Sequence, residues 1–255
     1  TGNKEPESDA IIDEIKTMQT DVSLLKEPVY VHKAQALVYG YIYASQKKLS
    51  KIGIQMTYVT PEPETINKFL EEYTFERIEE WFNKLITGFK RWTDYTFDER
   101  HKRTESIREL KFPYEYREGQ KNLCVSVYRA IEDNTNLYIQ APTGVGKTLS
   151  TVFPAVQALG QQMSDKIFYL TSKTITRTVA EDTYAILRDN GLHMRTVTLT
   201  AKDKICPLDE RNCNPVACPY AKGHFDRIND AVYDIITSQM VIGRDNVMEY
   251  ANRHH

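Results

Sequence analysis

Residues 141–148 read Ala-Pro-Thr-Gly-Val-Gly-Lys-Thr, and this stretch decides the fold of the chain around it. It follows a short apolar run at 136–140 and precedes a run with helical spacing, so it predicts a strand, a glycine-rich turn and a helix. Gly144 and Gly146 let backbone amides turn inward, where they can hold a triphosphate together with the positive end of the helix. The strict pattern begins with glycine, and Ala141 stands in that place here. The alternative is an ordinary glycine turn before a helix.

The residue types in and before this loop predict a nucleotide site. Lys147 can reach the β- and γ-phosphates of ATP, and the Thr148 hydroxyl can ligate Mg²⁺, so both are candidates for ATP hydrolysis. Arg117 and Gln120 are three residues apart on an expected helix, and a glutamine amide matches the donor and acceptor of an adenine edge. The candidate nucleotide-binding residues are Arg117, Gln120, Ala141, Pro142, Thr143, Gly144, Val145, Gly146, Lys147 and Thr148.

Composition limits the class of protein. The 255 residues are 41% hydrophobic and 27% charged, which is typical of a folded chain. The formal net charge is −2, so any nucleic-acid affinity must come from local basic patches. We find no apolar run near the roughly 18 residues that a membrane span needs and no export signal, and we expect a cytoplasmic location. The chain begins with Thr1 rather than Met, so we expect a fragment of a longer protein.

Alternating strand and helix patterns predict an α/β chain in four stretches. Residues 1–63 are expected to form a strand–helix–strand unit, and residues 64–110 a helical connector. Residues 111–200 are expected to build a mostly parallel sheet covered on both faces, and residues 201–255 carry most of the cysteines. The expected strands are 10–15, 52–59, 136–140, 167–171 and 195–200, and the expected helices include 32–48, 117–134, 147–159 and 174–188.

Cysteine spacing predicts a metal site. Cys206, Cys213 and Cys218 lie within thirteen residues, and in a chain without an export signal clustered cysteines more often bind metal than form disulfides. Cys124 lies on an apolar helix face, which is typical of packing. A [4Fe–4S] cluster usually needs four thiolates. The alternatives are a zinc site with His224 as fourth ligand, or three unliganded thiols.

Three motifs in order carry a resemblance. Arg117-x-x-Gln120, the loop at 141–148 and the segment Tyr-Leu-Thr-Ser-Lys-Thr at 169–174 resemble the first motor domain of a superfamily 2 helicase. With the cysteine stretch, residues 110–255 are similar to the XPD/DinG branch, the iron–sulfur DNA helicases. The resemblance implies a RecA-like P-loop motor with an Fe–S insertion, adenine recognition by Gln120, and ATP, Mg²⁺ and a [4Fe–4S] cluster as cofactors. It implies single-strand contacts at Thr171, Ser172, Lys173 and Thr174.

The same resemblance extends to partners and cluster ligands. It implies translocation on single-stranded DNA, with 5′ to 3′ polarity, and unwinding of forked DNA. It makes Cys206, Cys213 and Cys218 cluster ligands, and it implies that the fourth cysteine lies beyond residue 255, after a helical stretch at about 223–252.

A second set of residues lies near the N-terminus. Glu14 and Lys16 are two apart on an expected strand and point to one side, where the carboxylate can bind Mg²⁺ and the ammonium can stabilise developing charge. Gln35 and Tyr39 share one face of the following helix. This order resembles the RecB-like PD-(D/E)xK nucleases, whose further metal-binding Asp is expected upstream of Thr1. The alternative is an ordinary βαβ packing unit.

These patterns together predict part of an ATP-dependent DNA helicase preceded by a partial restriction-endonuclease-like nuclease module. We see no acidic Asp-Glu box after the loop and no second motor domain, so the chain is expected to bind nucleotide weakly and hydrolyse little ATP. Two other functions stay open. One is a module whose loop and zinc-binding cysteines only recognise nucleic acid, and the other is a nuclease with a regulatory P-loop domain.

Overall fold

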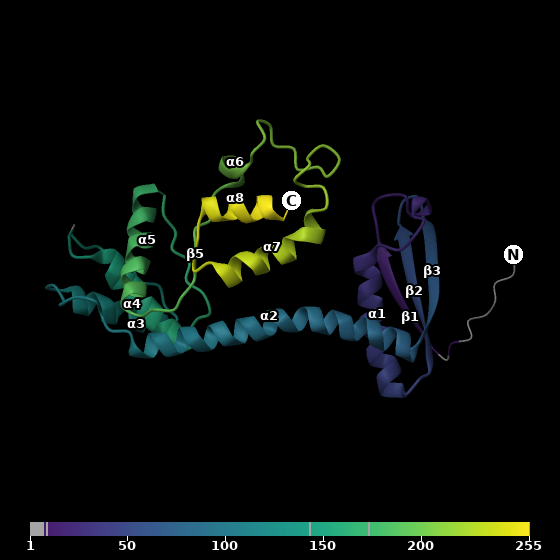
Figure 1. Ribbon diagram of the computed structural model, residues 1–255, viewed down its shortest axis with the longest axis horizontal. Coiled ribbons are helices and arrows are strands. Elements are labelled where there is room, and N and C mark those ends of the chain that lie inside the picture. The colour runs from purple at the N-terminus through teal and green to yellow at the C-terminus, as the bar shows by residue number, and fades with distance from the viewer. Residues whose placement is uncertain (1–7, 9, 143, 173, 255) are drawn as a thin grey trace. The chain divides into compact units, whose positions relative to one another are not determined.

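The computed structural model describes residues 8, 10–142, 144–172 and 174–254 (Figure 1). The chain divides into unit 1, Thr1–Asp94, and unit 2, Tyr95–His255. Unit 1 contains β1 (Ile11–Thr17), the short helix η1 (Val22–Leu24), α1 (Tyr30–Lys47), β2 (Lys51–Thr60), β3 (Thr65–Thr74) and the start of α2 (Phe75–Glu109). Unit 2 contains the rest of α2, α3 (Gln120–Glu132), α4 (Lys147–Gly160), α5 (Thr174–Asp189), β4 (Thr196–Val197), α6 (Lys202–Ile205), α7 (His224–Ser238), β5 (Val241–Ile242) and α8 (Arg244–Arg253).

Unit 1 is a three-stranded sheet with helix α1 packed against it. The strand order is β1-β2-β3, with β1 parallel to β2 and β3 antiparallel to β2. The expected strand–helix–strand unit is therefore confirmed. Ile54, Met56 and Tyr58 alternate along one face of β2 and are buried in the core. A Cβ at Gly40 of α1 would lie 2.5 Å from Ile54 Cδ1, so glycine permits the close approach of helix and sheet.

The expected helical connector at 64–110 is wrong near its start, because Thr65–Thr74 form strand β3. Exposure alternates along β3, and every residue of β3 pairs with β2. Phe69 lies opposite Met56, so the pairing of β3 with β2 places two apolar side chains side by side. The two would not be neighbours across strands if this segment were helical. The helical spacing begins at Phe75, and from there α2 runs to Glu109 as expected.

Unit 2 is organised by packed helices. The three expected helices around the glycine-rich loop are observed as α3, α4 and α5, and α4 packs against both of the others. Its apolar side chains Val156 and Leu159 are buried with Leu187 of α5. Burial raises the pKa of Tyr184 to about 12, so its hydroxyl stays protonated inside this core.

The expected mostly parallel sheet does not form within the described part of unit 2. Residues 136–140 and 167–171 are in no strand, and the expected strand at 195–200 is reduced to β4, which pairs in parallel with β5. A strand needs a hydrogen-bonded neighbour, and an apolar run alone does not supply one. Tyr138 is 93% exposed and Leu170 is 87% exposed, and of these two runs Ile167 is the residue that packs against the core of unit 2.

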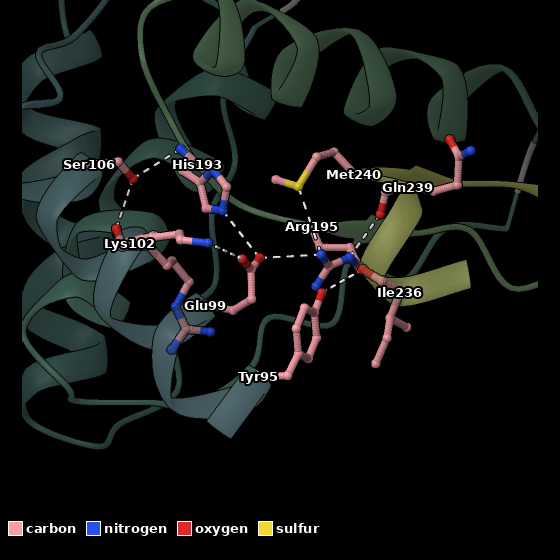
Figure 2. A network of polar contacts seen from close by, with 10 residues as sticks. Tyr95, Glu99, Lys102, Ser106, His193, Arg195, Ile236, Gln239 and Met240 are labelled. Carbon is pink, nitrogen blue, oxygen red and sulfur yellow. Dashed lines mark hydrogen bonds and ion pairs between the residues drawn. The ribbon is translucent and has the colours of Figure 1, made fainter. Parts of the chain in front are cut away.

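A polar network joins three parts of unit 2 (Figure 2). The Glu99 carboxylate of α2 accepts hydrogen bonds from His193 Nε2 at 3.1 Å and from an Arg195 guanidinium nitrogen at 3.2 Å. Arg195 Nε also donates to the Gln239 carbonyl at 2.9 Å, and the Tyr95 hydroxyl donates to the Ile236 carbonyl. The network therefore connects α2, the start of β4 and the end of α7.

The neighbours of Glu99 favour its ionised form in this network. Burial opposes ionisation of Glu99, but hydrogen bonds from His193 and Lys102, with the charges of His193 and Arg195, outweigh it and hold the pKa of Glu99 below its usual value.

Over the described residues, no helix combines the length and the apolar character that a membrane crossing requires.

Candidate functional site

The glycine-rich loop leads directly into helix α4, as the sequence predicts. Gly146 caps the helix with φ of +74°, and Gly144 has φ of +88°. Both values lie in the left-handed region that glycine adopts at low cost. The first amides of a helix lack intrahelical acceptors and attract anions, so the start of α4 at Lys147 suits a phosphate. Thr143 lies outside the described residues, and the expected strand before the loop is not observed.

Two cations bind the loop's own carbonyl oxygens. Lys147 Nζ donates to the carbonyls of Ala141 at 3.0 Å and Pro142 at 2.8 Å, and the Arg117 guanidinium donates to the Gly144 carbonyl. Among the described residues, the side-chain contacts of the Lys147 ammonium are these two neutral carbonyls. A phosphate oxygen forms a stronger charge-assisted hydrogen bond than a neutral carbonyl. The loop is therefore able to exchange these internal contacts for an anionic ligand.

Gln120 lies beneath the loop instead of facing solvent. Gln120 is only 5% exposed, and its side-chain oxygen Oε1 accepts a hydrogen bond from the backbone amide of Arg117 at 3.0 Å. A Cβ at Gly146 would lie 2.7 Å from Gln120 Nε2, so the amide touches the loop backbone. The structure thus gathers Arg117, Gln120 and the loop into one site. Adenine recognition by Gln120 stays a prediction, because its amide oxygen is engaged by the backbone here.

Two residues behind the loop were not predicted to support it. Ser150 is fully buried on α4, and its hydroxyl donates to the Gly146 carbonyl at 2.9 Å. Cys124 lies one turn after Gln120 on α3, and burial raises the pKa of its thiol despite a hydrogen bond with Ser150. The packing role expected for Cys124 is confirmed. The position of Ser150 four residues after Gly146 is the signal that could have identified it.

The segment expected to contact single-stranded DNA precedes α5. Thr171 and Ser172 are exposed, and the Thr171 hydroxyl contacts the Thr176 hydroxyl. Lys173 lies outside the described residues, and only the backbone of Thr174, the first residue of α5, is described. The nucleic-acid contacts of this segment stay a prediction.

The three clustered cysteines do not converge on one point. Cys206 is half-buried, Cys213 is exposed and Cys218 is buried, and all three are free thiols. In the stretches that the structure describes, no three His, Cys, Asp or Glu side chains form a group able to hold a metal ion. The Cys218 amide instead donates to the Asn214 carbonyl at 2.8 Å in a local turn. The side-chain positions therefore do not fit a preformed iron–sulfur or zinc site.

The four candidate nuclease residues of unit 1 form one connected cluster. Lys16 Nζ lies 2.8 Å from a Glu14 carboxylate oxygen and donates to Gln35 Oε1 at 3.0 Å. Gln35 Nε2 in turn donates to the Tyr39 hydroxyl at 3.2 Å. The shared faces predicted for Glu14 and Lys16 and for Gln35 and Tyr39 are confirmed. Glu14 is not part of any described group of three metal-binding side chains.

Comparison with known proteins bears on the loop region. The model of the family described as "DEAD/DEAH box helicase" matches residues 118–212, which include the loop, α4 and α5. The match is to a helicase domain. A curated protein, "Probable ATP-dependent helicase MJ0942" of Methanocaldococcus jannaschii, is 49% identical over 47 residues, which are 18% of this chain. No solved structure matches the chain significantly.

The extent of these similarities sets what they support. The family match covers less than half of the chain, and the aligned segment covers 7% of the length of the Methanocaldococcus protein. Together they support a likeness of residues 118–212 to the helicase superfamily. A mixed α/β arrangement with this domain fits a RecA-like motor. They do not extend to the nuclease-like unit or to an iron–sulfur insertion.

Proposed function

We propose that unit 2 carries the ATP-binding part of a DNA helicase of the XPD/DinG type, which couples ATP hydrolysis to translocation on single-stranded DNA. The observation that carries this proposal is the set of contacts that the Lys147 ammonium makes. This ammonium lies beside a glycine-lined helix N-terminus and is balanced, among the described residues, only by the neutral carbonyls of Ala141 and Pro142. A site with this charge and geometry is suited to a terminal phosphate.

The proposal assigns roles to the other residues. Lys147 and the amides at the start of α4 bind the phosphates, and Thr148 holds Mg²⁺. Arg117 leaves the Gly144 carbonyl when the loop opens, and Gln120 then presents its amide to adenine. Single-stranded DNA lies along residues 171–174 at the start of α5, where helix amides and hydroxyl groups suit backbone phosphates.

Nucleotide binding tests the proposal directly. The measurement is calorimetric titration of the chain with Mg·ATP, followed by an assay of hydrolysis with and without single-stranded DNA. We expect Lys147→Ala to weaken ATP binding at least tenfold, because the phosphates lose their ammonium partner, and to abolish the little ATP hydrolysis that is expected of the chain. Lys84→Ala is the matched control, since Lys84 is an exposed lysine of α2 in unit 1. Equal ATP affinity in all three proteins would refute the proposal.

The iron–sulfur part of the proposal rests on the resemblance to the XPD/DinG helicases together with the cysteine spacing. Because the three thiols do not converge, no step of the reaction is assigned to a cluster. We propose that Cys206, Cys213 and Cys218 come together only when metal binds. Anaerobic reconstitution followed by iron, sulfide and zinc analysis tests this. Cys213→Ser should lose bound iron, and Cys124→Ala should retain it, because Cys124 is packed on α3. Equal iron in both variants would exclude the assigned ligand set.

The second candidate function is metal-dependent DNA cleavage by unit 1. The hydrogen-bonded series Glu14, Lys16, Gln35 and Tyr39 favours it, because an ammonium held between a carboxylate and an amide is positioned to stabilise developing charge. Cleavage of DNA with Mg²⁺ or Mn²⁺ should disappear in Glu14→Gln and in Lys16→Ala. Glu72→Gln, an exposed carboxylate of β3, serves as the control. Cleavage that persists in Lys16→Ala would rule this function out.

A further inference from the structure

A hollow in unit 2 lies apart from every residue assigned so far. It encloses about 420 Å³ and is lined from four directions, by α5, by the residues after β4, by α6 and by the start of α8. Strands β4 and β5 are parallel, so both end at the same edge, where Thr198 donates its amide to the Ile242 carbonyl at 2.8 Å. The hollow therefore opens at the carboxyl ends of two parallel strands, a place where ligands commonly bind in α/β proteins.

Positive charge prevails in this hollow. Arg177, Lys204 and Arg244 line it, against the carboxylates of Glu181 and Asp245. Glu181 is already engaged, because it accepts from the Thr198 hydroxyl at 2.7 Å and lies 3.5 Å from Arg177.

The two remaining cations are available to a ligand. Lys204 and Arg244 are exposed, and neither forms an ion pair with another residue that the structure describes. Helix α8 begins at Arg244, so its first amides, which lack intrahelical acceptors, lie at the same edge. The carboxylate of Asp245 lies in the same first turn of α8, and the three cations against the two carboxylates of the lining leave a net positive charge for an anion.

We propose that this hollow binds a backbone phosphate of single-stranded nucleic acid. The assignment rests on the proposed helicase function and adds a phosphate contact outside residues 171–174. Arg177 lies one turn after Thr174 on α5, so a strand that follows residues 171–174 reaches the hollow along the same helix. The volume is many times the roughly 30 Å³ of one water molecule, so the hollow admits a sugar–phosphate unit and not only a free anion.

The recognition is electrostatic and independent of base sequence. An arginine binds phosphate oxygens in a bidentate manner, and a lysine binds them as a point charge. Each phosphate neutralised in a single strand contributes about −0.7 to the slope of log K against log salt concentration. Loss of the two unpaired cations should therefore change both the affinity and this slope.

The test is a double variant, Lys204→Gln with Arg244→Gln, in the full chain. Fluorescence anisotropy measures binding of a labelled single-stranded oligonucleotide at several salt concentrations. We expect binding roughly tenfold weaker and a slope shallower by about 0.7, the contribution of one phosphate. The control, Lys84→Gln with Lys90→Gln, changes net charge equally at exposed positions of α2 in unit 1. It should match the wild-type chain, and ATP affinity should be unchanged in both double variants.

Three outcomes would overturn the assignment. If the double variant and the control bind the oligonucleotide alike, the hollow is not a phosphate site, although nucleic-acid binding elsewhere would stand. If inorganic phosphate binds the wild-type hollow as tightly as the oligonucleotide does, the ligand is a free anion. If the wild-type chain binds no oligonucleotide even at low salt while still binding ATP, both this assignment and the DNA part of the proposed function fail.

Discussion

Strand β2 in unit 1 has a hydrogen-bonded neighbour on each side, whereas among the residues that the structure describes β4 in unit 2 pairs only with β5, over two residues. Along one face of β2 the residues from Ile52 to Tyr58 are buried against α1. In unit 2 the comparable apolar runs at 136–140 and 167–171 lie outside any strand. The difference indicates that unit 1 is held by a paired sheet and its apolar core.

Unit 2 is held by other interactions. Helix α4 packs between α3 and α5, and the polar network around Glu99 joins α2 to the segments beside β4 and β5 (Figure 2). Helix packing needs only local spacing and an apolar stripe, while a parallel sheet needs distant segments to meet. The contrast predicts which substitutions each unit tolerates.

The largest effect is expected from truncation of buried residues. Ile54→Ala in β2 and Leu159→Ala in α4 should each lower the free energy of unfolding by about 2–5 kcal/mol, because each removes apolar atoms and leaves a cavity. Tyr138→Ala should change it by no more than about 0.5 kcal/mol, because Tyr138 is exposed. Urea unfolding measures all three. A large cost at Tyr138 would mean that residues 136–140 are a buried strand after all, and the contrast between the units would fail.

A smaller effect is expected in the loop before α4. Gly146→Ala combines a positive φ with a Cβ 2.7 Å from Gln120 Nε2, and should cost about 1–3 kcal/mol. Gly144→Ala also places alanine at positive φ but meets no atom within 4 Å, and should cost about 1 kcal/mol. Thermal unfolding of the two variants separates backbone strain from steric contact. Equal losses would show that Gln120 yields without cost.

The polar network should add a pH-dependent contribution. Because the pKa of Glu99 is held below its usual value, its stabilisation is present at neutral pH and is lost as the pH falls through the lowered value. Glu99→Gln should cost about 1–2 kcal/mol at pH 7, and the difference from wild type should shrink as the pH falls below the usual range of a glutamate and close once the pH is below the lowered pKa of Glu99. The control is Glu105→Gln, an exposed partner of His101 on the same helix, with a cost below about 0.5 kcal/mol. A difference that persists unchanged into acid would contradict the ionic origin of the effect.

The smallest effect is expected in the cysteine segment. Cys213→Ser in the metal-free chain should shift the midpoint of urea unfolding very little, within about 0.5 kcal/mol, because the Cys213 thiol is exposed. Cys218→Ser should cost more, since it places a hydroxyl in a buried position. If Cys213→Ser were the more damaging of the two, the exposed thiol would have a structural role that its position does not explain.

The features that short-range spacing controls were predictable. The strand–helix–strand unit, the helix after the glycine-rich loop and the shared faces of Glu14 with Lys16 and Gln35 with Tyr39 all follow from periods of two or 3.6 residues. Strand β3 was missed because its alternation lies next to a stronger helical pattern that begins at Phe75.

The remaining features depend on residues far apart in the chain. Spacing could not indicate that Gln120 would be buried under Gly146, that Cys206, Cys213 and Cys218 would stay apart, or that Glu99 would meet His193 and Arg195 across more than ninety positions. The amino-acid order determined the helices, the glycine turn and the local pairs, because a side chain a few residues away is positioned by backbone geometry alone. Only the tertiary structure decided which apolar runs became strands and which charges met, because those outcomes require two distant segments to come together and satisfy each other's hydrogen bonds.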